Sequence, residues 1–377
     1  MLLYLLSLFL PYSNTKCLIF YYYITSVKNL DCFNLTNQLN NNLMKYSIIL
    51  PVRNGGEYIK ECILNILSQT LDNFNLIILE NFSTDGTQAW IESLNDPRII
   101  IIPAEKPLSM QENWSRAAFI DRNEFMTMVG ADDVLYPDYL QTIDDLIIKH
   151  PGASLYQTHF RFINEEGKTI RNCQPMKEEE TAAEFLESIC LNKISIMGTG
   201  FMMRSSDYTM VGGIPDYPSL LFADFELWIE LTRLKYKATA AATCFSYRVH
   251  TNSTTASSSY KNYAEGFDRL MLYFEKLILK DKDIAGYINN NWITLINYYC
   301  KGSAHKLLRT PLNKRGGISV NDVLNKYQKY AQDMIPNIKY KPTATFSIRL
   351  AKFIDSNFLS RELFFLFKKI YNKPIYH

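Results

Sequence analysis

Two adjacent aspartates, Asp132 and Asp133, follow an apolar run in the segment MVGADDVLYPDYL. Neighbouring carboxylates repel each other, so ionising both is unfavourable unless a positive group lies close to them. In an isolated loop, turn chemistry is the usual reason for such a pair. Here the pair ends a segment typical of a buried strand, and hard divalent cations such as Mg²⁺ prefer oxygen ligands. The pair therefore predicts a site for Mg²⁺ or Mn²⁺.

Two more carboxylates, Glu80 and Asp85, lie in the segment LENFSTDGT after another apolar run. Carboxylates in such a position can accept hydrogen bonds from the N–H groups or hydroxyls of a ligand. The same segment is also typical of a helix N-cap, which needs no ligand. Both interpretations remain open from these residues alone.

The segments that must position these side chains alternate between strand-like and helix-like patterns up to about residue 135. Short links between them predict a parallel sheet with helices on both faces. Ligands of such sheets bind beyond the carboxyl ends of the strands, which is where the polar clusters fall. We expect strands at 46–52, 74–80, 98–103 and 124–130, and helices at 55–70, 84–94 and 110–120.

Beyond residue 140 the pattern is mixed, and after the polar link 251–259 it becomes helical and rich in lysine and aromatic residues. The sequence therefore predicts an α/β domain over 44–255 and a helical region over 256–377. Within the first domain we also expect strands at 153–164, 194–204 and 239–250, and helices at 181–192 and 222–234.

The composition is that of a globular protein, with 47% hydrophobic and 21% charged residues in a chain of 377. This balance argues against a largely disordered chain. The net charge of +2 gives no sign of a polyanionic partner, and we expect no nucleic acid. Seven scattered cysteines without a CxxC motif favour reduced thiols in a cytoplasmic protein.

Residues 1–43 differ from the rest of the chain. The apolar stretch at their start, MLLYLLSLFLPY, is shorter than the roughly 20 residues of a membrane span and lacks the basic n-region of a signal peptide. Together with CLIFYYYITSV it could form one broken membrane helix. We favour Met44 as the true start, since MKYSIILPV leads directly into a strand, and expect 1–43 to be an extension outside the true protein.

Four segments in order, ILPVRNGGEYI, LILENFSTDGT, VGADDVLYPDYL and FADFELWIEL, resemble the family 2 glycosyltransferases over roughly residues 45–255. The resemblance implies a GT-A (Rossmann-like) mostly parallel sheet flanked by helices, followed here by a helical appendage. It also implies inverting transfer of one sugar from a nucleotide-diphosphate sugar to an acceptor hydroxyl. In this family an aspartate at the position of Asp224 is the general base, and Asp132 and Asp133 would hold the metal.

The resemblance assigns further residues to the site. Glu226 and Trp228 would line the acceptor side, although a tryptophan at this spacing is also typical of a core. The nucleotide-sugar would contact Pro51, Arg53, Glu80, Asp85, Asp132 and His250.

Family members usually carry two aspartates where this chain has Glu80 and Asn81. At three positions the acid itself is missing: Asn81 and Gly130 replace aspartates, and Ala223 replaces a glutamate. These departures favour an alternative, a nucleotide-sugar-binding protein with this fold but without turnover. A third hypothesis, nucleotidyl transfer, has thin support from the two glycines and one arginine of PVRNGGEY.

The family resemblance suggests a role in assembling polysaccharide or lipopolysaccharide of the cell envelope, with a glycan or a lipid-linked acceptor. Residues 346–373 combine Phe, Leu and Ile with lysines and arginines, a pattern typical of a basic amphipathic helix on an anionic membrane. Packing on the catalytic domain is the other interpretation of this tail. We expect a cytoplasmic protein, with peripheral contact to the inner face of the cell membrane if the tail binds lipid.

Overall fold

The computed structural model describes residues 44–250 and 258–370. Residues Lys45–His377 group into one compact unit, separate from Met1–Met44. The proposed membrane helix within 1–43 lies outside the described residues, and so does most of the predicted boundary between the two regions of the larger unit. Among the described residues, no helix combines the length and apolar character that crossing a bilayer requires.

A mixed ten-stranded sheet forms the first part of this unit, in the order β3-β2-β1-β4-β9-β6-β10-β5, with β7 beside β6 and β8 beside β10. The half built from β1, β2, β3 and β4 is parallel, as the strand–helix alternation predicted. Every residue of β1 is buried, which explains its run of apolar side chains. The strands are β1 Tyr46–Val52, β2 Phe74–Glu80, β3 Ile99–Pro103, β4 Phe125–Met128, β5 Val134–Leu135, β6 Leu155–Ile163, β7 Thr169–Asn172, β8 Glu179–Glu180, β9 Phe201–Arg204 and β10 Lys237–Arg248.

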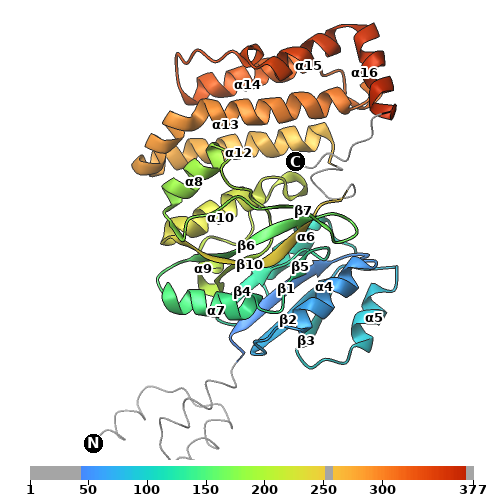
Figure 1. The fold of residues 1–377 in the computed structure, drawn as a ribbon, viewed down its shortest axis with the longest axis vertical. Coiled ribbons are helices and arrows are strands. Elements are labelled where there is room, and N and C mark those ends of the chain that lie inside the picture. The colour runs from blue at the N-terminus through green and yellow to red at the C-terminus, as the bar shows by residue number, and fades with distance from the viewer. Residues whose placement is uncertain (1–43, 251–257, 371–377) are drawn as a thin grey trace, which may run out of the picture. The chain divides into compact units, whose positions relative to one another are not determined.

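Helices cover this sheet (Figure 1). Several have clear start signals, such as the capping box of Thr181 and Glu184 at α8. The helices are α4 Tyr58–Leu67, α5 Thr87–Ser93, α6 Met110–Ser115, α7 Tyr139–Lys149, α8 Ala182–Cys190, α9 Ser205–Met210 and α10 Ala223–Leu234.

A helical region follows, in which α12 and α13 lie between the sheet and the last three helices (Figure 1). Its core is aromatic: the ring of Phe267 lies 4.9 Å from that of Tyr299 and 5.0 Å from that of Tyr327. The helices are α12 Tyr260–Lys280, α13 Lys282–Arg309, α14 Val320–Met334, α15 Phe346–Ser356 and α16 Phe358–Ile370.

Most predicted elements are confirmed within a few residues, but two differ in an instructive way. The strand expected at 194–204 is reduced to β9, because Gly200 adopts a φ of +79° that interrupts extended backbone. The tail expected as one helix at 346–373 is two helices, α15 and α16, separated at Asn357, which has an extended backbone.

Candidate active site

The loops that follow β1 and β2 are joined into one rim by hydrogen bonds. Asn54 accepts a bond from the backbone N–H of Thr84 at 2.8 Å and donates its own N–H to the Ser83 hydroxyl at 2.9 Å. Asp85 accepts from the N–H of Gly56 at 3.0 Å. Hydrogen bonding, chiefly from Thr87, lowers the pKa of this exposed aspartate, which is therefore ionised at neutral pH. The rim thus carries a negative charge at the predicted nucleotide pocket.

Glu80 lies at the carboxyl end of β2 and is only 1% exposed. Its two carboxylate oxygens accept hydrogen bonds from the backbone N–H groups of Phe82 at 3.0 Å and Ser83 at 2.8 Å. These bonds hold Phe82 at a φ of 57°, with its ring 45% exposed on the rim. In this structure Glu80 shapes the loop, and its contact with a nucleotide base stays a prediction.

The other two residues predicted to line this pocket differ in access. Pro51 is buried within β1, whereas Arg53 is exposed just beyond it. The Arg53 guanidinium donates a weak hydrogen bond to the carbonyl of Leu108 at 3.5 Å. Asn81 binds both the N–H and the carbonyl of Leu108, at 2.8 and 3.0 Å. The amide at position 81 therefore ties two loops together, which an aspartate could not do with both atoms.

The adjacent aspartates have different surroundings. Asp133 is 1% exposed and accepts hydrogen bonds from the Thr199 hydroxyl at 2.6 Å and the Arg248 backbone N–H at 3.0 Å. Burial, and then the charge of Asp132, raise the pKa of Asp133. The Asp132 side chain is 35% exposed and lies 2.7 Å from Nε2 of His250. The hydrogen bond with Asp132 raises the pKa of His250. Asp133 is therefore held inside the fold by protein groups, whereas Asp132 is open to solvent and to a ligand.

Gly130 explains how the pair can accommodate a cation. A Cβ at this position would lie 2.9 Å from Oδ1 of Asp132 and 3.0 Å from Oδ2 of Asp133, closer than real Cβ contacts allow. The missing side chain therefore leaves a space on which two carboxylate oxygens converge. Mg²⁺ is commonly held by one or two carboxylates plus water and phosphate oxygens, and this donor set fits that mode. The described residues contain no cluster of three or more His, Cys, Asp or Glu side chains that could enclose a metal alone.

Arg248, buried at the end of β10, holds this arrangement in place. It donates to the carbonyl of Asp132 at 2.8 Å and forms an ion pair with Glu61 at 2.6 Å. Its guanidinium also lies 4.7 Å from the ring of Tyr58, and it donates to two carbonyls in the loop after β6. Tyr58, Glu61 and Thr199 were not identified from the sequence. The spacing of Tyr58 and Glu61, one turn apart on α4, is a signal only once their common partner is known.

Asp224 begins the helix α10 and lies next to the segment that supports the aspartate pair. A Cβ at Gly198 would lie 3.9 Å from the Cβ of Asp224, and the next residue is the Thr199 that binds Asp133. Burial raises the pKa of Asp224 to about 6. Burial followed by the charges of Asp133, Asp132 and Asp224 raises the pKa of Tyr247, so this tyrosine lies among all three acids.

The backbone that leads into Asp224 is strained. Ser219, Leu220 and Phe222 all have positive φ, at 53°, 59° and 73°, although none is glycine. Such conformations persist only where surrounding contacts impose them, and they cluster at functional sites.

The helix α12 supplies those contacts. Asn262 donates to the Ser219 hydroxyl at 3.1 Å. The ring of Phe222 packs against those of Tyr263 and Phe267, at 5.2 and 5.6 Å. A Cβ at Gly266 would meet the carbonyl of Leu221 at 3.0 Å, so a glycine permits this close approach. The helical region therefore holds the segment that carries Asp224.

The predicted acceptor-side residues lie two positions apart on α10, and so point to different sides of the helix. Glu226 is half-buried and accepts a hydrogen bond from the Tyr217 hydroxyl at 2.6 Å. Trp228 is 1% exposed, donates its indole N–H to the Met197 carbonyl at 2.9 Å and stacks on Phe201 at 4.4 Å. The structure corrects the placement of Trp228, because a fully packed ring in the core offers no surface to an acceptor.

Comparison with known proteins agrees with this geometry. The family model "Glycosyl transferase family 2" matches residues 47–210. An uncharacterized glycosyltransferase of Haemophilus influenzae is 23% identical over 279 residues, covering 71% of this chain and 84% of the relative. The UDP-Glc:alpha-D-GlcNAc-diphosphoundecaprenol beta-1,3-glucosyltransferase WfgD of Escherichia coli is 22% identical over 247 residues, covering 64% of this chain and 91% of the relative.

Among solved structures, S. aureus TarS 1–349 in complex with UDP-GlcNAc matches with a TM-score of 0.54 and 14% identity. The match covers 82% of this chain and 91% of TarS 1–349. A likeness at this identity establishes the GT-A-like fold. Residues 47–210, fewer than half of the chain, thus match glycosyl transferase family 2 and lie within this GT-A-like fold.

Proposed function

We propose that the protein is an inverting glycosyltransferase in which Asp224 is the general base. The observation that carries this proposal is a carboxylate near the start of α10 whose pKa burial raises to about 6, beside Gly198, which precedes the Thr199 that binds Asp133. General base catalysis is most effective when the pKa of the base lies near the operating pH. Among the described residues, Asp224 has no cationic partner that would lower its basicity.

The reaction would proceed by single displacement. Asp224 takes the proton from the acceptor hydroxyl while that oxygen attacks the anomeric carbon from the face opposite the diphosphate. The new C–O bond forms as the bond to the diphosphate oxygen breaks, and the electron pair leaves with the diphosphate. Inverting glycosidases use a carboxylate base in the same way to activate water.

The donor would lie between the rim and the aspartate pair. Arg53, Glu80 and Asp85 would contact the nucleotide, and Asp132, backed by Asp133, would hold Mg²⁺ or Mn²⁺. A divalent cation bound there would neutralise negative charge on the leaving diphosphate. His250, fixed by its 2.7 Å contact with Asp132, would lie beside the same phosphates.

The names of two related proteins support a narrower proposal. WfgD uses UDP-glucose and a GlcNAc-diphosphoundecaprenol acceptor, and TarS was solved with UDP-GlcNAc. We infer a UDP-sugar donor and a lipid-linked glycan acceptor, as in assembly of a cell-envelope polysaccharide. Glu226 would lie on the acceptor side, and the reaction would take place at the cytoplasmic face of a membrane.

The test is to incubate the purified full chain with UDP-glucose, UDP-galactose or UDP-GlcNAc, Mn²⁺ and a GlcNAc-diphospholipid acceptor. We expect release of UDP and a product whose anomeric configuration, read by NMR, is opposite to that of the donor. Chelation of the metal should abolish turnover. A product with retained configuration would contradict single displacement. If no UDP-sugar raises the melting temperature in the presence of Mn²⁺, the proposed donor is wrong.

A further inference from the structure

The last two helices, α15 and α16, carry an unusual concentration of exposed apolar side chains. Of the 21 large apolar residues that are exposed in the described structure, nine lie between residues 346 and 370. The other twelve are spread over the rest of the described chain. Such a concentration of exposed apolar side chains on two successive helices points to a protein or membrane contact. The nine residues are Phe346, Leu350, Phe353, Phe358, Leu359, Leu363, Leu366, Phe367 and Ile370.

The helix α16 exposes an apolar stripe in addition to Phe364, which packs against the core. Leu359, Leu363, Leu366 and Ile370 recur at spacings of four, three and four, which places them on one face, and they are 56–75% exposed. The polar residues Ser360, Arg361 and Lys368 of the same helix are instead half-buried. None of the α16 side chains that the structure describes is buried. The apolar face of α16 therefore points away from the protein.

The helix α15 separates its faces more conventionally. Ile348, Ala351 and Asp355 are buried toward the rest of the helical region. Phe346, Leu350 and Phe353 form the opposite, exposed stripe at helical spacing. We call the exposed residues of the two stripes, Phe346, Leu350, Phe353, Leu359, Leu363, Leu366 and Ile370, the apolar face.

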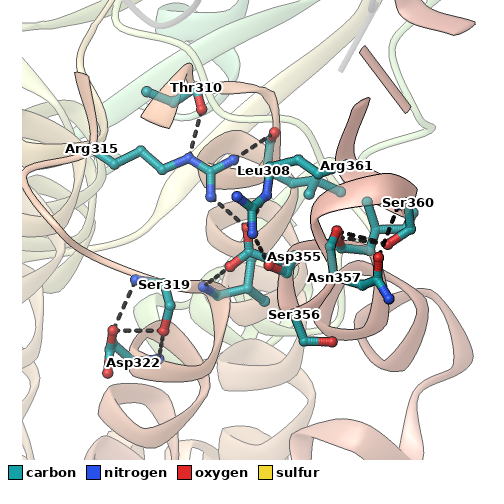
Figure 2. Close-up of polar contacts among 12 residues, drawn as sticks. Leu308, Thr310, Arg315, Ser319, Asp322, Asp355, Ser356, Asn357, Ser360 and Arg361 are labelled. Carbon is teal, nitrogen blue, oxygen red and sulfur yellow. Dashed lines mark hydrogen bonds and ion pairs between the residues drawn. The ribbon is translucent and has the colours of Figure 1, made fainter. Parts of the chain in front are cut away.

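A buried polar network fixes the orientation of this face (Figure 2). Arg315 forms an ion pair with Asp355 at 2.5 Å and donates to the carbonyls of Thr310 at 2.6 Å and Leu308 at 2.9 Å. Across the junction of α15 and α16, Arg361 donates to the carbonyl of Asp355. The Asn357 side chain accepts from the N–H of Leu359 at 2.9 Å and so caps α16. Because these contacts span the junction, exposure of the apolar face is a fixed property of the fold.

Basic residues outnumber acidic ones in the two helices that carry the apolar face. Residues 346–370 contain five basic and two acidic residues, and one of the two acids is the buried Asp355. Arg349 and Lys352 are exposed on α15.

We propose that the apolar face docks onto a phospholipid bilayer with anionic headgroups. The leucine and phenylalanine side chains would enter the boundary between headgroups and acyl chains, and the exposed Arg349 and Lys352 would contact lipid phosphates. A second copy of the chain fits less well, because a two-fold interface would bring the same basic residues of both copies together. The proposal agrees with a lipid-linked acceptor but does not depend on glycosyl transfer.

The test is co-sedimentation of the full chain with vesicles of phosphatidylglycerol and phosphatidylcholine, compared with phosphatidylcholine alone. We expect binding to the anionic vesicles that weakens as salt rises. The double variant Leu363→Ser/Leu366→Ser and the double variant Arg349→Glu/Lys352→Glu should each bind at least about tenfold more weakly. Leu279→Ser is the matched control, because Leu279 is 87% exposed on α12, outside the apolar face, and should leave binding unchanged.

Amide hydrogen exchange locates the contact independently of any binding by residues 1–43. Vesicles should slow exchange across residues 358–370. Unchanged binding by the leucine variant, or equal binding to neutral vesicles, would overturn the proposal. A parent protein that is dimeric without vesicles, and monomeric in the leucine variant, would assign the face to contact between copies instead. These measurements contain no donor sugar, so their outcome is separate from that of the proposed transfer reaction.

Discussion

Asp224 in the candidate active site and Asp355 in the helical region are the same side chain in opposite environments: Asp355 is paired with a cation, and Asp224 is not. Asp355 is 7% exposed, and its two oxygens accept hydrogen bonds from Arg315 at 2.5 Å and from the N–H of Val320 at 2.7 Å. Asp224 accepts hydrogen bonds from the backbone N–H of Phe225 and from its own, and no cation is among the causes of its pKa shift. Burial without a cation raises the pKa of Asp224 to about 6. The helical region uses its carboxylate for stability, whereas the site keeps a reactive one at a cost in stability.

The largest expected effect is on the rate of transfer in Asp224→Asn. The amide cannot accept the acceptor proton, so turnover should fall by about 10²–10⁴-fold, the usual range for loss of a general base. Donor affinity, measured by calorimetry with Mn²⁺, should stay within about twofold. The matched control is Asp216→Asn, at an exposed aspartate upstream of α10. Near-full turnover in Asp224→Asn would show that the base lies elsewhere.

Asp355→Asn should have the largest effect on stability. The substitution leaves the Arg315 guanidinium buried without its counter-charge, which costs about 3–5 kcal/mol of unfolding free energy. Denaturant unfolding of the full chain measures this loss. The control Asp333→Asn, at an exposed position on α14, should change stability by less than about 0.5 kcal/mol.

A double variant tests whether the loss of stability comes from the unpaired charge of Arg315 or from its lost hydrogen bonds to backbone carbonyls. Replacing both partners by apolar residues, as in Arg315→Met/Asp355→Leu, should recover most of the stability that Asp355→Asn loses. If the double variant is as unstable as the single one, the network acts mainly through its hydrogen bonds to backbone carbonyls.

Asp224→Asn should change the free energy of unfolding in the opposite direction from Asp355→Asn and stabilise the protein. Because the pKa of Asp224 is raised from 3.8 to about 6 in the folded state, ionising this group disfavours the native state. The cost appears as pH rises from about 4 to about 6 and is fully present at pH 7, where it amounts to about 1–3 kcal/mol. The variant should therefore unfold at higher denaturant at pH 7 and show no gain below about pH 4. Equal stability at pH 7 would contradict the raised pKa.

The difference between these two regions also explains what could be predicted from the sequence. Strands such as 46–52 were predictable because buried parallel strands are continuous apolar runs. Asp132 and Asp133 were identifiable because they follow a predicted strand at the ligand edge of the sheet, and Asp224 because its segment resembles the family motif. The ion pair of Arg315 with Asp355 joins residues 40 positions apart and leaves no local pattern.

Other features were hidden for the same reason. Asp133 differs from Asp132 because Thr199 and Arg248 donate hydrogen bonds to it. These two residues come from distant parts of the sequence, so only the fold brings them to Asp133. Trp228 was assigned to the acceptor side by its neighbours in sequence, but packing against Phe201 decides its environment. The single helix expected at 346–373 missed the break at Asn357, whose side chain caps the second helix.

The smallest expected effect is on the pH dependence of kcat/KM, which distinguishes a titrating general base from an aspartate with only a structural role. Because Asp224 must be ionised to accept a proton, kcat/KM should fall as pH drops through about 6, by about tenfold for each further pH unit. The residual activity of Asp224→Asn should be flat over the same range, since the group that titrates is gone. Asp355 makes no contact with the site, so Asp355→Asn should show the same fall in kcat/KM at low pH as the parent protein. This is measured at a temperature where the variant remains folded. An acid limb that persists in Asp224→Asn would mean that another group, and not the carboxylate at the start of α10, sets the pH dependence.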